Sequence, residues 1–96
     1  MDFTFDAPLW RWKGDSPWHF VSLPNEVADE IEDAALHRGG FGSVRVSVNV
    51  GESTWATSIF PDKQHATFLL PMKKQIRVHE ALAEGDVVRV HLQIVH

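Results

Sequence analysis

The chain has 96 residues, of which 44% are hydrophobic and 23% are charged, and it carries a net charge of −4 with no cysteine. This length allows one small domain and excludes a catalytic domain joined to a regulatory one. The composition excludes a disordered chain, an apolar span of roughly 20 residues, disulfides and thiolate chemistry. The N-terminal "MDFTFDAP" is acidic and lacks the apolar stretch of a secretory signal, so we expect a cytoplasmic protein without membrane association.

The first half of the sequence predicts the order strand, strand, helix, strand. Apolar and polar residues alternate in the first and the last of these three strands. A proline precedes the amphipathic helix, and a glycine in the left-handed conformation is expected to end it. These elements are expected at residues 2–12, 18–23, 25–36 and 44–50, with the helix between Pro24 and either Gly39 or Gly40.

The second half predicts the same order again. A tight turn at Gly51-Glu52 and a second turn at residues 61–64 connect two strands, and Pro71 opens a second amphipathic helix that Gly85 ends. The strands are expected at residues 53–60, 65–70 and 86–95, and the helix at 72–84.

The two halves also resemble each other in detail. "HFVSLP" precedes the first helix and "TFLLP" the second, while "SVRVSV" and "VVRVHL" follow them. We therefore predict one mainly β domain over residues 1–96, a six-stranded closed or split β-barrel with pseudo-twofold strand-strand-helix-strand halves and two capping helices. The alternative is a six-stranded α+β sheet without internal symmetry.

Five ordered sequence blocks carry a family resemblance: "WHFVSLP", "GSVRVSVNVG", "TWATSIFPDK", "FLLPMKKQIR" and "LAEGDVVRVHL". Over essentially the whole chain they resemble an uncharacterised bacterial family, the domain of unknown function number nineteen-hundred-and-five. The resemblance implies a small split β-barrel capped by helices, found alone or beside a bacteriocin-protection-type domain, with no assigned activity. His79, His91 and His96 depart from the family pattern, so no shared role is expected of them.

A second, shorter resemblance suggests a different function. The segment "FLLPMKKQIRVHEALAEGDVVRV" is similar to the strand, proline, helix, Gly-Asp, strand unit of the antitoxin and transition-state-regulator family, in which a swapped hairpin dimer binds DNA. The net charge of −4 and the acidic first helix argue against nucleic-acid binding at physiological salt. We therefore keep a nucleic-acid-binding barrel of this type only as the alternative function.

The start of the second helix is a candidate anion site. Lys73 and Arg77 lie four residues apart and are expected to share one helix face beside free backbone N–H groups. We expect a weak site for phosphate or carboxylate there. The alternative is a solvated basic face on which Lys74 and Arg77 pair with nearby acids.

The four tryptophans allow two interpretations. Trp10, Trp12, Trp18 and Trp55 could fill the interior of a small barrel with their large rings. They could instead form the wall of an aromatic cleft, with His19 and Arg45 at its rim. Partial exposure of two or more of the rings would favour the cleft.

Residues that could support catalysis or metal binding show no recognisable pattern. The six histidines lack metal-ligand spacing, so neither a metal nor a cofactor is expected. Ser53, Thr54, Thr57 and Ser58 lack a nucleophile turn and are expected to satisfy polar groups of the strands. A hydrolase or metal enzyme is therefore the second alternative, and a histidine and an acid converging in a pocket would favour it.

Together these observations favour a non-enzymatic β-barrel that binds a small anionic or aromatic ligand or a protein partner. The predicted binding residues are Trp18, Arg45, Trp55, Lys73 and Arg77. Isolated cations around a concavity would support this function, whereas a continuous basic stripe across the sheet would support nucleic-acid binding.

Overall fold

The computed structural model describes residues 1–35 and 38–95, which form six strands, two α-helices and one 3₁₀ turn. The elements, in chain order, are β1 Asp2–Arg11, β2 His19–Ser22, α1 Asn25–Ala34, η1 Gly40–Gly42, β3 Val44–Val50, β4 Ser53–Asp62, β5 Thr67–Pro71, α2 Lys74–His79 and β6 Val87–Ile94. Within the described part of the chain, no helix is long and apolar enough to cross a membrane.

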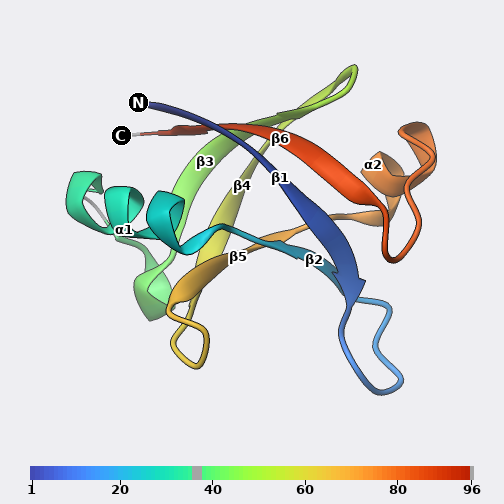
Figure 1. The fold of residues 1–96 in the computed structure, drawn as a ribbon, viewed down its shortest axis with the longest axis horizontal. Coiled ribbons are helices and arrows are strands. Elements are labelled where there is room, and N and C mark those ends of the chain that lie inside the picture. Colours follow the sequence, from blue (N-terminus) through green and yellow to red (C-terminus); the bar gives the residue numbers. More distant parts are fainter. Residues whose placement is uncertain (36–37, 96) are drawn as a thin grey trace.

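The six strands form a closed barrel in the order β1-β2-β5-β4-β3-β6, and every neighbouring pair is antiparallel. This confirms the predicted mainly β fold and shows that the barrel is closed rather than split. Exchanging β1 with β4, β2 with β5 and β3 with β6 leaves the strand order unchanged, as the predicted pseudo-twofold symmetry requires. The helices α1 and α2 lie at opposite ends of the barrel (Figure 1).

Two backbone hydrogen bonds reveal how the halves correspond. The N–H of Leu23 donates to the carbonyl of Phe68 at 3.0 Å, and the N–H of Met72 donates to the carbonyl of His19 at 2.9 Å. The twofold exchange makes Leu23 equivalent to Met72, so the residue equivalent to Pro24 is Lys73 rather than Pro71. Pro24 and Lys73 are indeed the N-cap residues of the two helices. The matching "LP" pairs in the sequence are therefore two residues out of register.

Helix α2 is much shorter than predicted. It begins at Lys74 and ends at His79, because Ala81 adopts a left-handed conformation with φ 54°. The N–H of Leu82 then donates to the carbonyl of Arg77 at 2.8 Å, as in a Schellman cap. Gly85, the predicted helix end, has φ 93° and instead turns the chain into β6, with its N–H bonded to the Leu9 carbonyl at 2.7 Å.

The end of α1 also differs from the prediction. The helix ends at Ala34, and the N–H of its C-cap residue Ala35 donates to the carbonyl of Ile31. Gly39 has φ −83°, so it is not the left-handed cap; the left-handed residues of this connection are Phe41 and Gly42 in η1. The predicted helix residue at position 36 lies outside the described residues.

The turns and the other strand ends show smaller differences. The Gly51-Glu52 turn between β3 and β4 is confirmed, with φ 57° at Gly51. Strand β4 continues through Pro61 to Asp62, so the next turn occupies residues 63–66 rather than 61–64. This later turn also delays the start of β5 to Thr67.

The barrel interior is filled by the alternating apolar residues that the sequence predicted. In β3 and β6 these are Val44, Val46, Val48 and Val50, and Val88, Val90, Leu92 and Ile94, all of them buried. Helix α1 contributes Ala28 and Ile31 to the same core, and α2 contributes Ile76.

Of the two interpretations of the tryptophans, the one that places them in the interior is wrong for three of the four. Trp55 is half-buried and packs against the core. Trp10 is half-buried on the outer face, whereas Trp12 and Trp18 are 50% and 59% exposed. The reason is strand alternation. Leu9 in β1 and Val21 in β2 point inward and are buried, so the alternate positions along these segments, which include the tryptophans, point outward.

Candidate functional site

One side of the barrel carries aromatic residues on its outer face, where antiparallel sheets usually show polar residues. The strands β1, β2, β5 and β4 are neighbours there, and their inward positions hold buried residues such as Val21, Ile59 and Leu70. The alternate positions and the loop before β2 then form an apolar outer surface. We call this surface the aromatic groove: Trp10, Trp12, Trp18, Phe20, Phe60, Leu69 and Pro71.

Strand register brings these rings together. Trp10 pairs with Phe20 across β1 and β2, Phe20 pairs with Pro71 across β2 and β5, and Phe60 pairs with Leu69 across β4 and β5. The ring centroids of Trp10 and Phe20 are 5.2 Å apart, a normal distance for an aromatic pair. The indole N–H of Trp10 donates to Ser22 Oγ at 2.9 Å, which fixes that ring against the sheet.

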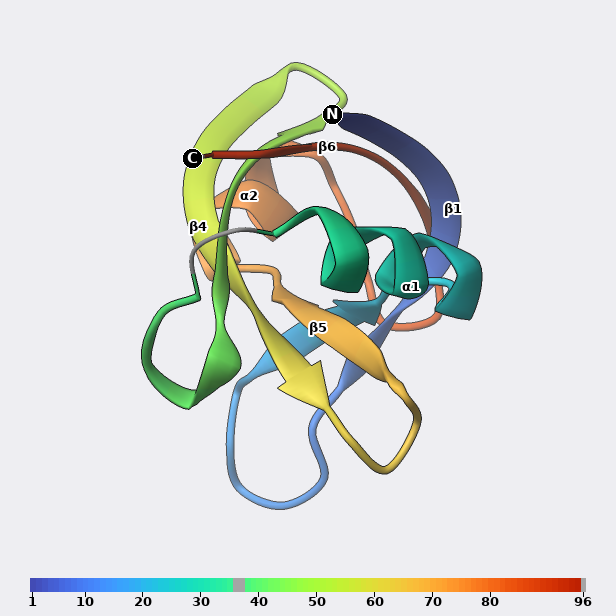
Figure 2. The same cartoon turned by 90° about the vertical axis from the view of Figure 1, so that its left-hand side faces the viewer.

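The aromatic groove consists of three adjoining hollows. The hairpin lobe, of about 880 Å³, lies between the β1–β2 and β4–β5 loops, which project beyond the barrel on the same side (Figures 1 and 2). The central lobe, of about 480 Å³, shares Trp12 and Leu69 with the hairpin lobe. The helix lobe, of about 260 Å³, shares Trp18 and Pro71 with the central lobe and reaches α2. The lobes therefore form one elongated depression.

Most of the cations of the chain border this depression. Six of the nine lysines and arginines line the hairpin or helix lobe, and we call them the basic rim: Arg11, Lys13, Lys63, Lys73, Lys74 and Arg77. Among the described residues that line the three lobes, Asp62 is the one acid. The positive charge is thus concentrated around the aromatic groove in a chain whose net charge is −4.

The basic rim makes no ion pair within residues 1–35 and 38–95. By contrast, Arg38 contacts Glu32 at 3.2 Å, and Arg89 contacts Asp6 at 2.8 Å. The hydrogen bond and charge of Arg89 hold the pKa of Asp6 below its ordinary value, and Asp6 raises the pKa of Arg89. These paired arginines lie outside the three lobes.

The helix lobe contains the predicted anion site in altered form. Lys73 is the N-cap of the six-residue α2 rather than part of it, so Lys73 and Arg77 do not share two turns of a helix face. Nε of Arg77 donates to the carbonyl of Met72 at 3.0 Å, which holds the guanidinium against the strand-to-helix connection. Lys73 and Lys74 are exposed beside it. Three cations therefore converge on this lobe, without the contribution of a long helix dipole.

The structure brings together three of the five predicted binding residues. Trp18, Lys73 and Arg77 line the helix lobe together with His19. Arg45 projects outward from β3, which lies across the barrel from β2, and Trp55 packs inward from β4. The sequence reasoning named Trp10 and Trp12 only as possible walls of an aromatic cleft, and it missed Phe20 and Phe60, whose outward positions in alternating strands were the available signal.

A histidine and an acid meet in the hairpin lobe. Nδ1 of His65 lies 2.8 Å from Oδ2 of Asp62 across the turn between β4 and β5, and the histidine side chain is mostly exposed. Two hydroxyls line the same lobe, but Ser22 accepts from Trp10, and Thr67 donates to the Leu23 carbonyl at 2.6 Å. The pair therefore stabilises a surface turn, and both hydroxyls have structural partners.

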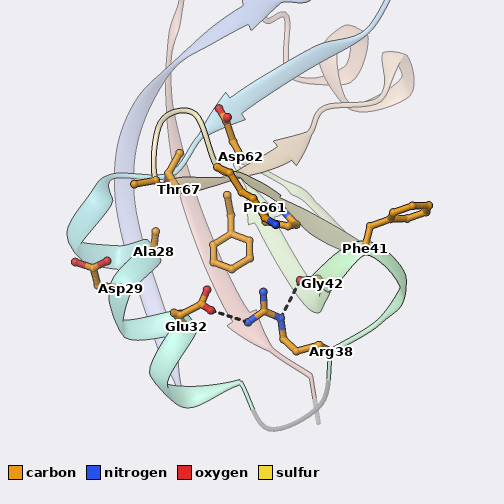
Figure 3. A pocket seen from close by; sticks show the side chains of 12 residues that line it. Ala28, Asp29, Glu32, Arg38, Phe41, Gly42, Pro61, Asp62 and Thr67 are labelled. Carbon is orange, nitrogen blue, oxygen red and sulfur yellow. Dashed lines mark hydrogen bonds and ion pairs between the residues drawn. The ribbon is translucent and has the colours of Figure 1, made fainter.

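Another cavity, of about 760 Å³, lies at the α1 end of the barrel. Arg38 spans it, bonding to Glu32 and to the Gly42 carbonyl, while Phe41 points away from it (Figure 3). The Arg38 guanidinium also lies 5.3 Å from the ring centroid of buried Phe68. Because this arginine is engaged on three sides, the barrel-end cavity offers a ligand less free charge than the aromatic groove does.

Metal-binding residues do not gather in the described part of the chain, where no three histidine or acidic side chains lie close enough to hold an ion. Ser53, one of the hydroxyls predicted to satisfy polar groups, donates to Glu80 at 2.7 Å and anchors the β3–β4 turn to the end of α2.

Comparison with known proteins agrees with the sequence resemblance. No curated protein matches the chain. A family model described as a domain of unknown function (DUF1905) matches residues 5–92, which is nearly the whole barrel. The chain therefore belongs to the DUF1905 family.

Proposed function

We propose that this barrel is a non-enzymatic binding domain whose aromatic groove takes a small anionic ligand with a flat aromatic body. A protein partner that presents such groups would use the same face. The observation that carries the proposal is the placement of six cations around five exposed or half-buried aromatic rings in a chain of net charge −4. A cytoplasmic location stays a prediction from the sequence.

The chemistry of the groove supports a ligand with both properties. Exposed indole faces at Trp12 and Trp18 offer apolar area for stacking, and the hairpin and central lobes have volumes in the range of small-molecule sites. Charged contacts to Lys73 and Lys74 are solvent-exposed, so salt screens them and they contribute modestly. Phosphate or carboxylate alone should therefore bind with millimolar to high micromolar affinity, and an aromatic anion more tightly.

The two alternatives have less support. A nucleic-acid barrel of the transition-regulator type would be favoured by a continuous basic stripe, whereas the cations of the basic rim surround a hollow. A hydrolase would need a nucleophile beside the His65 and Asp62 pair, and neither hydroxyl of that lobe bonds to His65 among the described contacts.

The test compares three probes: one that carries both a negative charge and an aromatic ring, one with the ring alone, and one with the charge alone. A ligand that binds only the native state raises its apparent stability, so thermal unfolding is followed with naphthalene-2-sulfonate, neutral 2-naphthalenemethanol and methanesulfonate. We expect the aromatic anion to raise the melting temperature more than either partial probe does. Equal shifts for the aromatic anion and methanesulfonate, or no shift with any probe, would refute the proposal.

A matched pair of variants locates the site. Lys73→Ala with Lys74→Ala should weaken the response to naphthalene-2-sulfonate. The control is Arg45→Ala, an exposed cation on β3 across the barrel from β2, which should leave the response unchanged. The double variant removes two positive charges and the control removes one, so a loss in Arg45→Ala of half the size or more would show that the probe responds to overall charge rather than to the groove.

A further inference from the structure

We infer that the natural ligand of the aromatic groove is a short segment of single-stranded nucleic acid, bound through its bases and phosphates without sequence preference. This inference rests on the proposed function and names the ligand class. It begins from the length of the groove, in which the hairpin, central and helix lobes follow one another through shared lining residues.

The distribution of charge along the groove calls for more than one anionic group. Arg11, Lys13 and Lys63 border the hairpin lobe at one end, whereas Lys73, Lys74 and Arg77 border the helix lobe at the other. The central lobe between them has no charged lining residue in the described part of the chain. A small monoanion could use only one end, so the arrangement fits an extended ligand with negative charges at both ends and flat apolar groups between them.

The central lobe offers ring faces rather than a deep apolar pit. Trp12, Trp18 and Phe60 are 50%, 59% and 40% exposed, and Phe20 lies among them on β2. Single-stranded nucleic acids bind to such surfaces by stacking bases on aromatic side chains while cations follow the phosphates. Every base has a π face, so this recognition tolerates any sequence.

An extended acidic peptide is the competing ligand, and the closed barrel disfavours its usual mode of binding. A peptide commonly adds to a sheet by pairing with the free backbone groups of an edge strand. Each of the six described strands has a neighbour on both sides. The groove segments of β1 and β4 that pair on one side only, residues 10–11 and 60–62, are two and three residues long, too short to hold an added strand. A peptide would have to bind mainly through side chains, whereas stacked bases need no backbone pairing.

The net charge of the chain does not oppose this inference. The argument from net charge treats the surface as uniform, but five carboxylates lie on α1, namely Glu26, Asp29, Glu30, Glu32 and Asp33, while six cations lie around the groove. A duplex hides its base faces in the stack, so the rings could not reach them. We therefore still expect no appreciable binding of duplex DNA at physiological salt.

The experiment follows intrinsic tryptophan fluorescence during titration with an oligothymidylate of about eight nucleotides at about 50 mM salt. The comparison ligands are inorganic polyphosphate, an acidic peptide containing phenylalanine, and a blunt DNA duplex. We expect the oligothymidylate to bind most tightly and its affinity to fall with salt by a slope of about 0.7 per phosphate contacted. Trp12→Ala with Trp18→Ala should lower the affinity at least about tenfold.

Each other outcome rejects the inference in a distinguishable way. Equal affinity for polyphosphate would mean that charge alone is recognised, and tighter binding of the peptide or the duplex would assign the groove to that ligand. Absence of oligothymidylate binding, with a retained response to naphthalene-2-sulfonate, would leave the proposed function intact and remove this ligand class. Failure of both probes would remove both proposals. Thermal unfolding of the tryptophan variant checks that it still folds.

Discussion

Trp18 and Phe20 lie with their rings almost parallel, at an interplanar angle of 8° and a centroid separation of 6.1 Å. Trp18 precedes β2 and Phe20 lies within it, so the two rings face outward on the same side of the sheet. They join the helix lobe to the central lobe, since Trp18 lines both. This relationship preorganises a flat apolar surface before any ligand arrives.

The exposed tryptophans should matter for binding and little for stability. Trp12→Ala with Trp18→Ala removes two rings that are at least half exposed, so we expect the free energy of unfolding to fall by less than about 1 kcal/mol for each. Trp55→Ala, by contrast, removes a ring packed on the core and should cost about 2 kcal/mol or more. Urea denaturation measures both. A larger loss for the exposed pair than for Trp55 would contradict the assignment.

The cations of the helix lobe should control the response to anions. Lys73→Ala with Arg77→Ala should abolish the thermal stabilisation produced by phosphate and leave the fold intact. Arg77 also holds the Met72 carbonyl, so Lys73→Ala with Lys74→Ala is the cleaner variant. Melting curves with and without phosphate decide the matter. If both double variants respond as the parent does, these side chains are only a solvated face.

Gly51 is expected to accept a side chain only at a cost in stability. It has φ 57°, and a Cβ atom built there would collide with the carboxylate of Glu80, which accepts from Ser53 Oγ at 2.7 Å. Gly51→Ala should therefore destabilise the protein by about 1 to 3 kcal/mol.

A double-mutant cycle separates the two causes of this loss. In a Glu80→Ala background the collision is relieved, so Gly51→Ala should cost less than it does in the parent. The same cost in both backgrounds would mean that backbone conformation alone is responsible. Denaturant unfolding of the four proteins supplies the cycle.

The Asp6 and Arg89 pair should contribute a pH-dependent part of the stability. Their hydrogen bonds, of 2.8 and 3.0 Å, join β1 to β6 and lower the pKa of Asp6 in the folded state. A lowered carboxyl pKa stabilises the fold above the unfolded pKa, and this contribution is lost as pH falls through the folded pKa. Both groups are exposed, so the effect is small.

Comparison of the parent with Asp6→Asn tests this sign. The parent should be the more stable protein at neutral pH, and the difference should shrink as the pH falls below about 4. Urea denaturation across this range gives the two stability curves. A difference that grows toward acid pH would show that the carboxylate is not stabilised by Arg89.

The sequence predicted the barrel more fully than it predicted the site. Valines at alternate positions of β3 reveal the inward face, and the repeated strand-strand-helix-strand order reveals the two halves. The same alternation places Trp10 and Phe20 outward, given the inward positions of Leu9 and Val21, so part of the aromatic groove was open to prediction. The general preference of tryptophan for buried positions argued the other way and was misleading here.

The remaining parts of the site depend on contacts between distant segments. Arg45 lies on β3 and Lys73 follows β5, so whether they meet depends on which strands are neighbours around the barrel, and β4 separates these two strands. The length of α2 depends on the left-handed conformation of Ala81, a residue type that gives no signal for it. Neither feature follows from local pattern.

The most direct test of the groove uses the four indole N–H signals of the protein in a ¹H–¹⁵N correlation spectrum, assigned by single substitutions. During titration with naphthalene-2-sulfonate, we predict that the signals of Trp12 and Trp18 move, because both rings are exposed in the aromatic groove. The signal of Trp55, which packs on the core from β4, should stay in place. Movement of Trp55 alone, or equal movement of all four signals, would contradict the assignment of the binding site to this groove.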